Sequence, residues 1–123
     1  MLDQTTFSIR VILKGMSNNK GNLMLALYQG KGNYMKNIFQ NIVQPFDNQK
    51  VAEIVFYKIP SGTYAISAYH DENANGKLDT NFLGIPLEKY GFSNNPNATF
   101  GVPDFEKSKF LVESDCSMTI YLK

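Results

Sequence analysis

The sequence has one cysteine, one histidine and no tryptophan. One cysteine cannot form an internal disulfide. Without a Cys-X-X-Cys pair or a Cys/His cluster, the chain has too few ligands for a zinc site or a dithiol redox centre. Cys116 stands where a strand is predicted to begin, so we interpret it as a small buried hydrophobic residue.

An excess of charge of one sign and a long hydrophobic run are also missing. The 123 residues include 12 basic and 11 acidic ones, with Arg10 the only arginine and a formal net charge of +1. Without a basic stripe, nucleic acid and anionic membrane surfaces are excluded as partners. No apolar run approaches the roughly 18 residues of a membrane helix. Residues 1–6 lack the basic and apolar regions of a signal peptide, so we expect neither a span nor a signal peptide in this chain.

The composition is that of a globular protein, with 43% hydrophobic and 13% aromatic residues. A chain of this length buries about two-thirds of its unfolded surface. We therefore expect a short tail at 1–6 and a single domain at 7–123.

Strand patterns dominate the sequence. Apolar residues alternate along 7–14 and 22–29, and the turn-rich segment between them predicts a hairpin. Segment 50–58 is apolar on both faces, which predicts a central strand. Further strands are predicted after the Pro-Ser-Gly turn at 60–62, at 110–113 and at 117–123. Tyr64 directly follows that turn, a position from which a tyrosine hydroxyl often bonds back to the upstream backbone.

Two short segments suit helical turns. Apolar residues recur at helical spacing in 34–44, although an irregular edge segment also fits this stretch. Segment 104–109 suits one turn that begins near Asp104. Together these features predict an all-β, antiparallel β-sandwich of about seven strands with one or two short helical turns.

Segment 71–79 has an oxygen-bearing side chain at every second position around a glycine. This spacing matches a calcium loop of EF-hand type, in which positions 1, 3, 5, 7 and 9 supply ligands and position 6 is glycine. The acid expected at position 12 is replaced by Phe82, and Glu88 is the nearest later acid that could close the site. The candidate ligands are the side chains of Asp71, Asn73, Asn75, Asp79 and Glu88 and the carbonyl of Lys77. Such a ligand set predicts weak Ca²⁺ binding, with a Kd of about 10⁻⁴ M or higher.

A second interpretation of 71–79 needs no metal. Asp71, Asn73 and Asn75 could cap backbone amides in nested Asx turns, with a hairpin turn at 75–76. The residues leave both interpretations open.

Two further functions are considered. His70 with a nearby carboxylate could serve a hydrolase-like enzyme, although a lone histidine at a strand end is more often structural. The aromatic loop 82–105 could bind a carbohydrate or peptide, or its rings could simply form a small core for the long ordered loop 80–105. The candidate platform residues are Tyr90, Phe92, Asn94, Asn95 and Phe100.

The segment 70–95 reads HDENANGKLDTNFLGIPLEKYGFSNN; IPSGTYAISAY precedes it and GVPDFEKSKF follows it. With these motifs the chain resembles, over nearly its whole length, the bacterial family called domain of unknown function 2141. The resemblance implies a small exported protein, periplasmic or secreted, with a transthyretin-like or immunoglobulin-like sandwich and no established activity. Residues 71–79 also resemble a dockerin-type calcium loop. We therefore expect a non-enzymatic binding or structural module, with a calcium-stabilised loop at 71–79 and a protein, peptide or glycan as partner.

Overall fold

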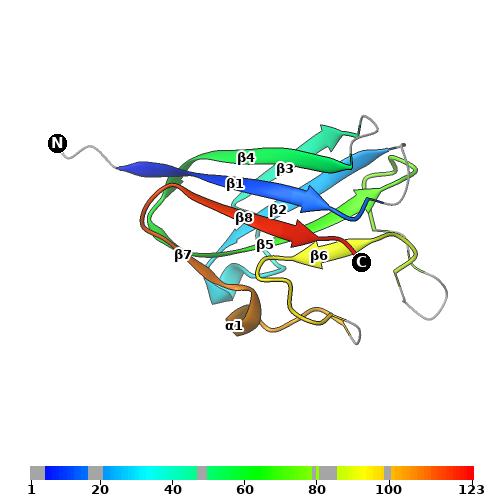
Figure 1. Cartoon of the computed structure of the whole chain (residues 1–123). Helices are drawn as coiled ribbons and strands as arrows, with labels where there is room; N and C mark the ends of the chain where they lie inside the picture. Colours follow the sequence, from blue (N-terminus) through cyan, green and yellow to red (C-terminus); the bar gives the residue numbers. More distant parts are fainter. Residues whose placement is uncertain (1–4, 17–20, 47–49, 79, 81–85, 99–100) are drawn as a thin grey trace.

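Two β-sheets pack face to face in the computed structural model, which describes residues 5–16, 21–46, 50–78, 80, 86–98 and 101–123 (Figure 1). The elements are β1 (Thr6–Lys14), β2 (Asn22–Gln29), the 3₁₀ helix η1 (Lys31–Asn33), β3 (Gln40–Pro45), β4 (Val51–Pro60), β5 (Gly62–Asp71), β6 (Tyr90–Phe92), α1 (Phe105–Ser108), β7 (Phe110–Val112) and β8 (Cys116–Tyr121). The predicted all-β sandwich is confirmed. Within the described part of the chain, no helix has the length and apolar character needed to cross a membrane.

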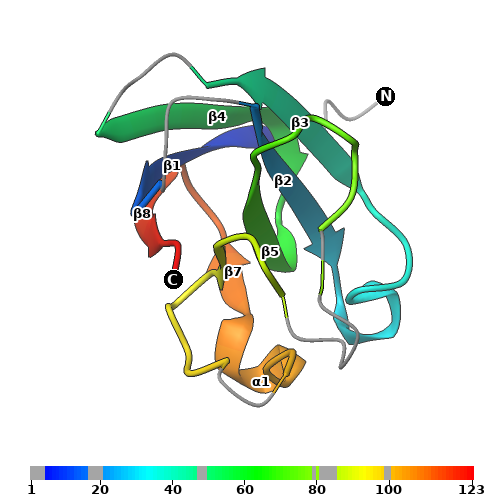
Figure 2. The ribbon, with the colours of Figure 1, turned by 90° about the vertical axis from the view of Figure 1, so that its right-hand side faces the viewer.

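The smaller sheet has the strand order β4-β1-β8, and the larger one has the order β3-β2-β5-β6, with β7 paired to the beginning of β5. Strands β1 and β8 pair in parallel, while the other strand pairs are antiparallel. The predicted hairpin is wrong, because β1 and β2 lie in different sheets (Figure 2). Alternation identifies which face of a strand is buried, but it does not identify the neighbouring strand.

Strand β4 lies at an edge of the smaller sheet, so its predicted central position is wrong. Its inward residues Ala52, Ile54 and Phe56 are buried as predicted, whereas Val51 and Tyr57 on the other face are exposed. An apolar outer face therefore does not require a covering layer here, because folded proteins expose much apolar surface.

Segment 34–44 does not form the predicted helical turns. Its second half is β3, an edge strand that pairs antiparallel with β2, and a 3₁₀ turn comes earlier, at η1. Pairing with β2 gives hydrogen-bond partners to backbone N–H and C=O groups that an isolated helical turn would leave unpaired. Pro45 ends β3 at the sheet edge, where a missing backbone donor is tolerated.

The core lies between the sheets and follows the predicted alternation. Its fully buried residues include Ile9, Val11, Leu13, Leu23, Leu27, Phe56, Ile66 and Ile120. The Tyr64 hydroxyl donates a hydrogen bond to the Pro60 carbonyl at 2.7 Å, which confirms the predicted bond to the upstream backbone. Cys116 begins β8 and packs against the core while remaining partly exposed. Burial, together with the neighbouring Asp115 carboxylate, raises the pKa of its thiol.

The sandwich is closed along one side, where the C-terminal end of the chain meets β6 (Figure 1). Tyr90 and Lys123 exchange backbone hydrogen bonds of 3.3 and 3.0 Å. Gly91 lies so close to β8 that a Cβ atom there would stand 2.7 Å from the carbonyl oxygen of Tyr121. Strand β6 and the start of α1 lie within the predicted loop 80–105, of which 81–85 and 99–100 lie outside the described residues.

Candidate functional site

The loop after β5 is organised by Asp71, the last residue of that strand. Its side chain is fully buried, and its two oxygens accept hydrogen bonds from the backbone amides of Asn75 (3.2 Å) and Gly76 (2.7 Å). The Asp71 carbonyl accepts a third bond, from the amide of Ala74 at 3.2 Å. One buried side chain therefore holds the first half of the loop.

The two asparagines continue this pattern. Asn73 Oδ1 accepts from the amide of Asn75 at 3.3 Å, and Asn75 Oδ1 accepts from the amide of Lys77 at 3.1 Å. Gly76, between Asn75 and Lys77, permits the bend with a left-handed φ of 82°. Asn73 and Asn75 thus each form an Asx turn, as in the metal-free interpretation, whereas Asp71 binds amides four and five residues later.

The Asp71 carboxylate has capacity for a cation. A carboxylate has about four lone-pair sites, so each Asp71 oxygen keeps at least one after accepting a single amide hydrogen. Asp79 lies outside the described residues. Among the residues that are described, no group of three or more His, Cys, Asp and Glu side chains could hold a metal ion. Cation binding by this loop stays a prediction.

Glu88 returns to the same loop. Its side chain is 6% exposed, and Oε2 accepts a hydrogen bond from the backbone amide of Glu72 at 2.7 Å. The segment after the loop is therefore tied to the residue that directly follows Asp71. This bond fixes the position of the loop relative to β5 and β6.

His70 is fully buried near the end of β5. Its ring contacts the ring of Phe46 edge to face, with 5.1 Å between the centroids. Its backbone amide donates to the carbonyl of Lys89 at 3.0 Å. A substrate could reach the imidazole only after the sandwich opened, so hydrolysis at His70 gains no support from the described residues.

The described residues of the predicted aromatic platform have two roles: Tyr90 and Phe92 border a cavity, and Asn94 and Asn95 bind backbone groups. Tyr90 and Phe92 contact each other edge to face at 6.1 Å, and Phe92 is only 5% exposed. The Tyr90 hydroxyl donates to the carbonyl of Ala98 at 2.7 Å. Phe100 lies outside the described residues. Tyr90 and Phe92 stand at the side of a cavity, described below, and they do not form a flat exposed plate.

The two asparagines of the predicted platform bind backbone. Asn94 Nδ2 donates to the carbonyl of Lys109 at 2.7 Å. Asn95 binds the edge of β8 with both ends of its amide, since Nδ2 donates to the Thr119 carbonyl and Oδ1 accepts from the Tyr121 amide, each at 2.9 Å. Both asparagines have a left-handed backbone, with φ of 69° and 54°. Their side chains join β6 to the rest of the sandwich.

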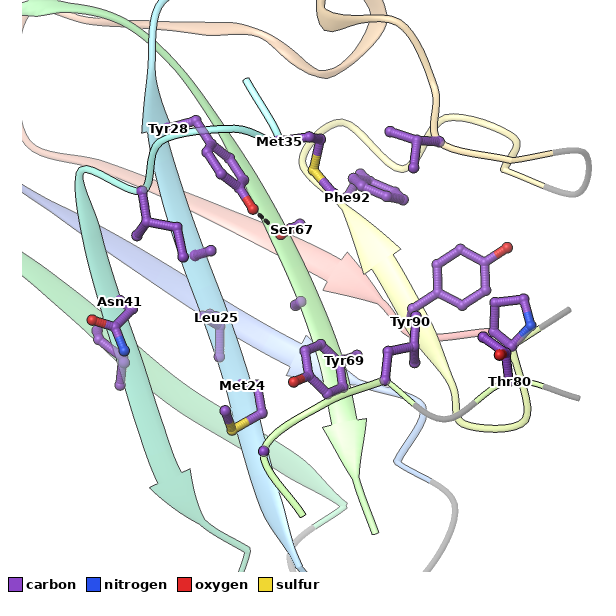
Figure 3. A pocket seen from close by; sticks show the side chains of 18 of the residues that line it. Met24, Leu25, Tyr28, Met35, Asn41, Ser67, Tyr69, Thr80, Tyr90 and Phe92 are labelled. Carbon is purple, nitrogen blue, oxygen red and sulfur yellow. Dashed lines mark hydrogen bonds between the residues drawn. The ribbon is translucent and has the colours of Figure 1, made fainter. Parts of the chain in front are cut away.

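A cavity of about 1050 Å³ lies on the outer face of the larger sheet, the face that points away from the core (Figure 3). Its floor consists of outward-facing side chains of two paired strands, Met24, Ala26 and Tyr28 of β2 and Ser67 and Tyr69 of β5. The alternation along 22–29 already predicted that these β2 residues face away from the core. The sequence signal for this floor was the lack of charged residues on the outward faces of β2 and β5. This signal can be recognised only when the pairing of the two strands is known.

The described wall residues of the cavity come from four stretches of the chain, 35–42, 76–80, 86–92 and 101–102. Met35 and Ile38 follow η1, while Asn41 and Ile42 belong to β3. The remaining wall consists of Gly76, Leu78, Thr80, Pro86, Tyr90, Phe92, Gly101 and Val102. The second half of the 71–79 loop and the described part of the predicted loop 80–105 therefore border the same space.

An aromatic cluster holds the segment after η1 in place beside the cavity. The ring of Tyr34 contacts those of Tyr28 and Phe105 edge to face, with centroid distances of 5.8 and 5.4 Å. The Tyr34 hydroxyl donates to the carbonyl of Pro103 at 2.8 Å, and burial raises the pKa of this tyrosine. Met35, the next residue, has a left-handed φ of 58° and belongs to the cavity wall.

Comparison with known proteins identifies one family. A family model described as "Uncharacterized protein conserved in bacteria (DUF2141)" matches residues 11–120. The curated proteins and the solved structures give no match.

Proposed function

The chain belongs to the DUF2141 family of bacterial proteins. We propose that it is a non-enzymatic binding module whose ligand occupies the cavity on the larger sheet. The cavity is the single observation that carries this proposal. Its volume of about 1050 Å³ is close to the upper end of ligand pockets, which span roughly 300–1,000 Å³. Such pockets combine a mostly apolar lining with a few polar groups, as this one does.

The chemistry of the lining favours binding over catalysis. General acids and bases that work near neutral pH are most often histidine or carboxylate side chains. The 19 described lining residues include neither, and their titratable groups are three tyrosines, Tyr28, Tyr69 and Tyr90. A binding role fits this lining.

The cavity is tested with N-phenyl-1-naphthylamine, an uncharged dye that fluoresces in apolar surroundings. We expect saturable binding by the folded protein. Ala26→Phe should abolish it, because Ala26 lies in the floor between Asn41 and Ser67 and a ring there fills the space. Val55→Phe is the matched control, since it adds a ring to the outer face of the smaller sheet. Absence of saturable binding, or equal binding by folded Ala26→Phe, would refute the proposal.

We further propose that the 71–79 loop binds Ca²⁺ weakly. The inward-turned oxygens of Asp71, Asn73 and Asn75 support this, and through Gly76 and Leu78 the loop borders the cavity. A cation that binds only the folded state at about 100 times its Kd adds about 2.7 kcal/mol of stability. For a Kd of about 10⁻⁴ M, about 10 mM CaCl₂ should therefore raise the Tm relative to EDTA. Asn73→Ala should reduce the increase; identical curves for the unmodified protein would contradict calcium binding.

We also propose that the protein acts in the periplasm or is secreted. The resemblance to a family of exported proteins supports this location. Expression from the native gene with a C-terminal tag, followed by fractionation, should place the protein in the periplasm or the medium. Recovery solely in the cytoplasmic fraction would contradict export.

A further inference from the structure

We infer that the cavity selects an uncharged ligand, one with an apolar body and a single hydroxyl or carbonyl oxygen that hydrogen-bonds to the Tyr28–Ser67 pair. The inference rests on the proposed binding function and adds the chemical class of the ligand. It follows from the absence of charge among the described lining residues, from the Tyr28–Ser67 hydroxyl pair and from the apolar rim.

The lining discriminates against charge. All 19 described lining residues are uncharged at neutral pH, so a buried carboxylate or ammonium group would face no described side chain of opposite charge. Burial of an unpaired ion costs far more than burial of a neutral polar group. A charged ligand head placed in the cavity would therefore carry this cost with no described side chain to offset it.

The Tyr28–Ser67 pair is a polar anchor in the floor; Tyr69 in the floor and Asn41 and Thr80 in the wall also carry polar groups. The Tyr28 hydroxyl and Ser67 Oγ lie 3.3 Å apart, on neighbouring strands, and Figure 3 shows this bond within the cavity lining. Each hydroxyl has one hydrogen, and their mutual bond uses only one of the two. The second hydrogen can be donated to an oxygen of the ligand. An oxygen-bearing head is thus favoured over a purely apolar one.

The remaining surface suits an apolar body of variable shape. Met24 and Met35 line the cavity with flexible thioether chains that adapt to different ligands. The rim is also apolar, since Met35, Ile38 and Val102 are 42, 56 and 55% exposed. A ligand that covers these side chains removes apolar surface from water, which favours its binding.

Displacement of N-phenyl-1-naphthylamine at pH 8 tests the ligand class with three probes that share one chain: dodecan-1-ol, dodecanoate and dodecylamine. We expect the neutral alcohol to displace the dye at a concentration at least about 100-fold lower than either ion, because only the ions carry a charge into the cavity. Equal displacement by dodecanoate or dodecylamine overturns the inference.

The anchor is tested by the double variant Ser67→Ala/Tyr28→Phe, because either single substitution leaves a hydroxyl that can still donate to the ligand. The double variant should weaken dodecan-1-ol binding by about 3–10-fold, the usual effect of one neutral hydrogen bond, and should weaken dye binding less. Thr119→Ala, on the smaller sheet, is the control and should change neither affinity. If the double variant weakens dodecan-1-ol binding no more than dye binding, the anchor is overturned. Failure of the dye itself to bind would refute the proposed function, whereas dye binding without selection for the neutral probe would refute only this inference.

Discussion

The loop after β5 depends on the buried carboxylate of Asp71, and its removal is the most informative perturbation of stability. In Asp71→Ala the amides of Asn75 and Gly76 lose the acceptors that they reach at 3.2 and 2.7 Å. In Asp71→Asn one oxygen remains, and an NH₂ group replaces the other and faces an amide donor. The two variants should therefore destabilise the protein in the order Ala > Asn.

The size of the effect follows from the number of bonds lost. A hydrogen bond to a charged group contributes about 1.5–3 kcal/mol, so we expect a loss of at least about 3 kcal/mol for Asp71→Ala and about half of that for Asp71→Asn. A domain of 123 residues loses about 4 °C of Tm per kcal/mol. The expected decreases in Tm are thus about 12 and 6 °C.

Thermal and urea unfolding in EDTA measure both variants without a contribution from bound cations. Asn73→Ala is the control in the same loop, because Asn73 is exposed and its Oδ1 accepts, at 3.3 Å, the Asn75 amide that Asp71 Oδ1 also accepts. It should cost about 0.5 kcal/mol or less, as do most exposed substitutions. The reasoning fails if Asp71→Ala unfolds at the same temperature and urea concentration as the unmodified protein. It also fails if Asn73→Ala lowers the stability as much as Asp71→Ala does.

Three other measurements test the packing. Gly91→Ala places a methyl group 2.7 Å from the Tyr121 carbonyl and should cost about 1–3 kcal/mol; unchanged urea unfolding would contradict this close approach. Tyr64→Phe removes the 2.7 Å bond to the Pro60 carbonyl and should cost about 1–2 kcal/mol, with unchanged stability as the contrary outcome. Burial raises the pKa of the Cys116 thiol, which lowers the thiolate fraction at pH 8. Iodoacetamide should thus modify the folded protein more slowly than the urea-unfolded chain; equal rates would show that the thiol is not protected.

Local patterns predicted the strands and their buried faces well. The alternation in 7–14 and 22–29 identified the core residues of β1 and β2, because a period of two requires only that one face meet the interior. The Pro-Ser-Gly turn predicted the Tyr64 bond because that bond spans only four residues. The predicted helical turn near Asp104 became α1.

Strand partners depended on long-range contacts. Strand β2 lies in the other sheet, and β1 instead pairs in parallel with β8, more than 100 residues later, for example through Ile9 and Cys116. Nothing in the alternation of either strand identifies that partner. The second half of segment 34–44 likewise became a strand because β2 offered an open edge, and this pairing outweighed its local helical spacing.

The sequence by itself determined the all-β class, the inward residues and the spacing of oxygen atoms along 71–79, because each of these is encoded within a few neighbouring residues. The tertiary structure alone decided that Glu88 returns to the amide of Glu72 and that the outward faces of β2 and β5 lie together as a cavity floor. Both features join segments that only the strand order brings into contact. A binding surface made from several distant segments exists only once the sheets have assembled.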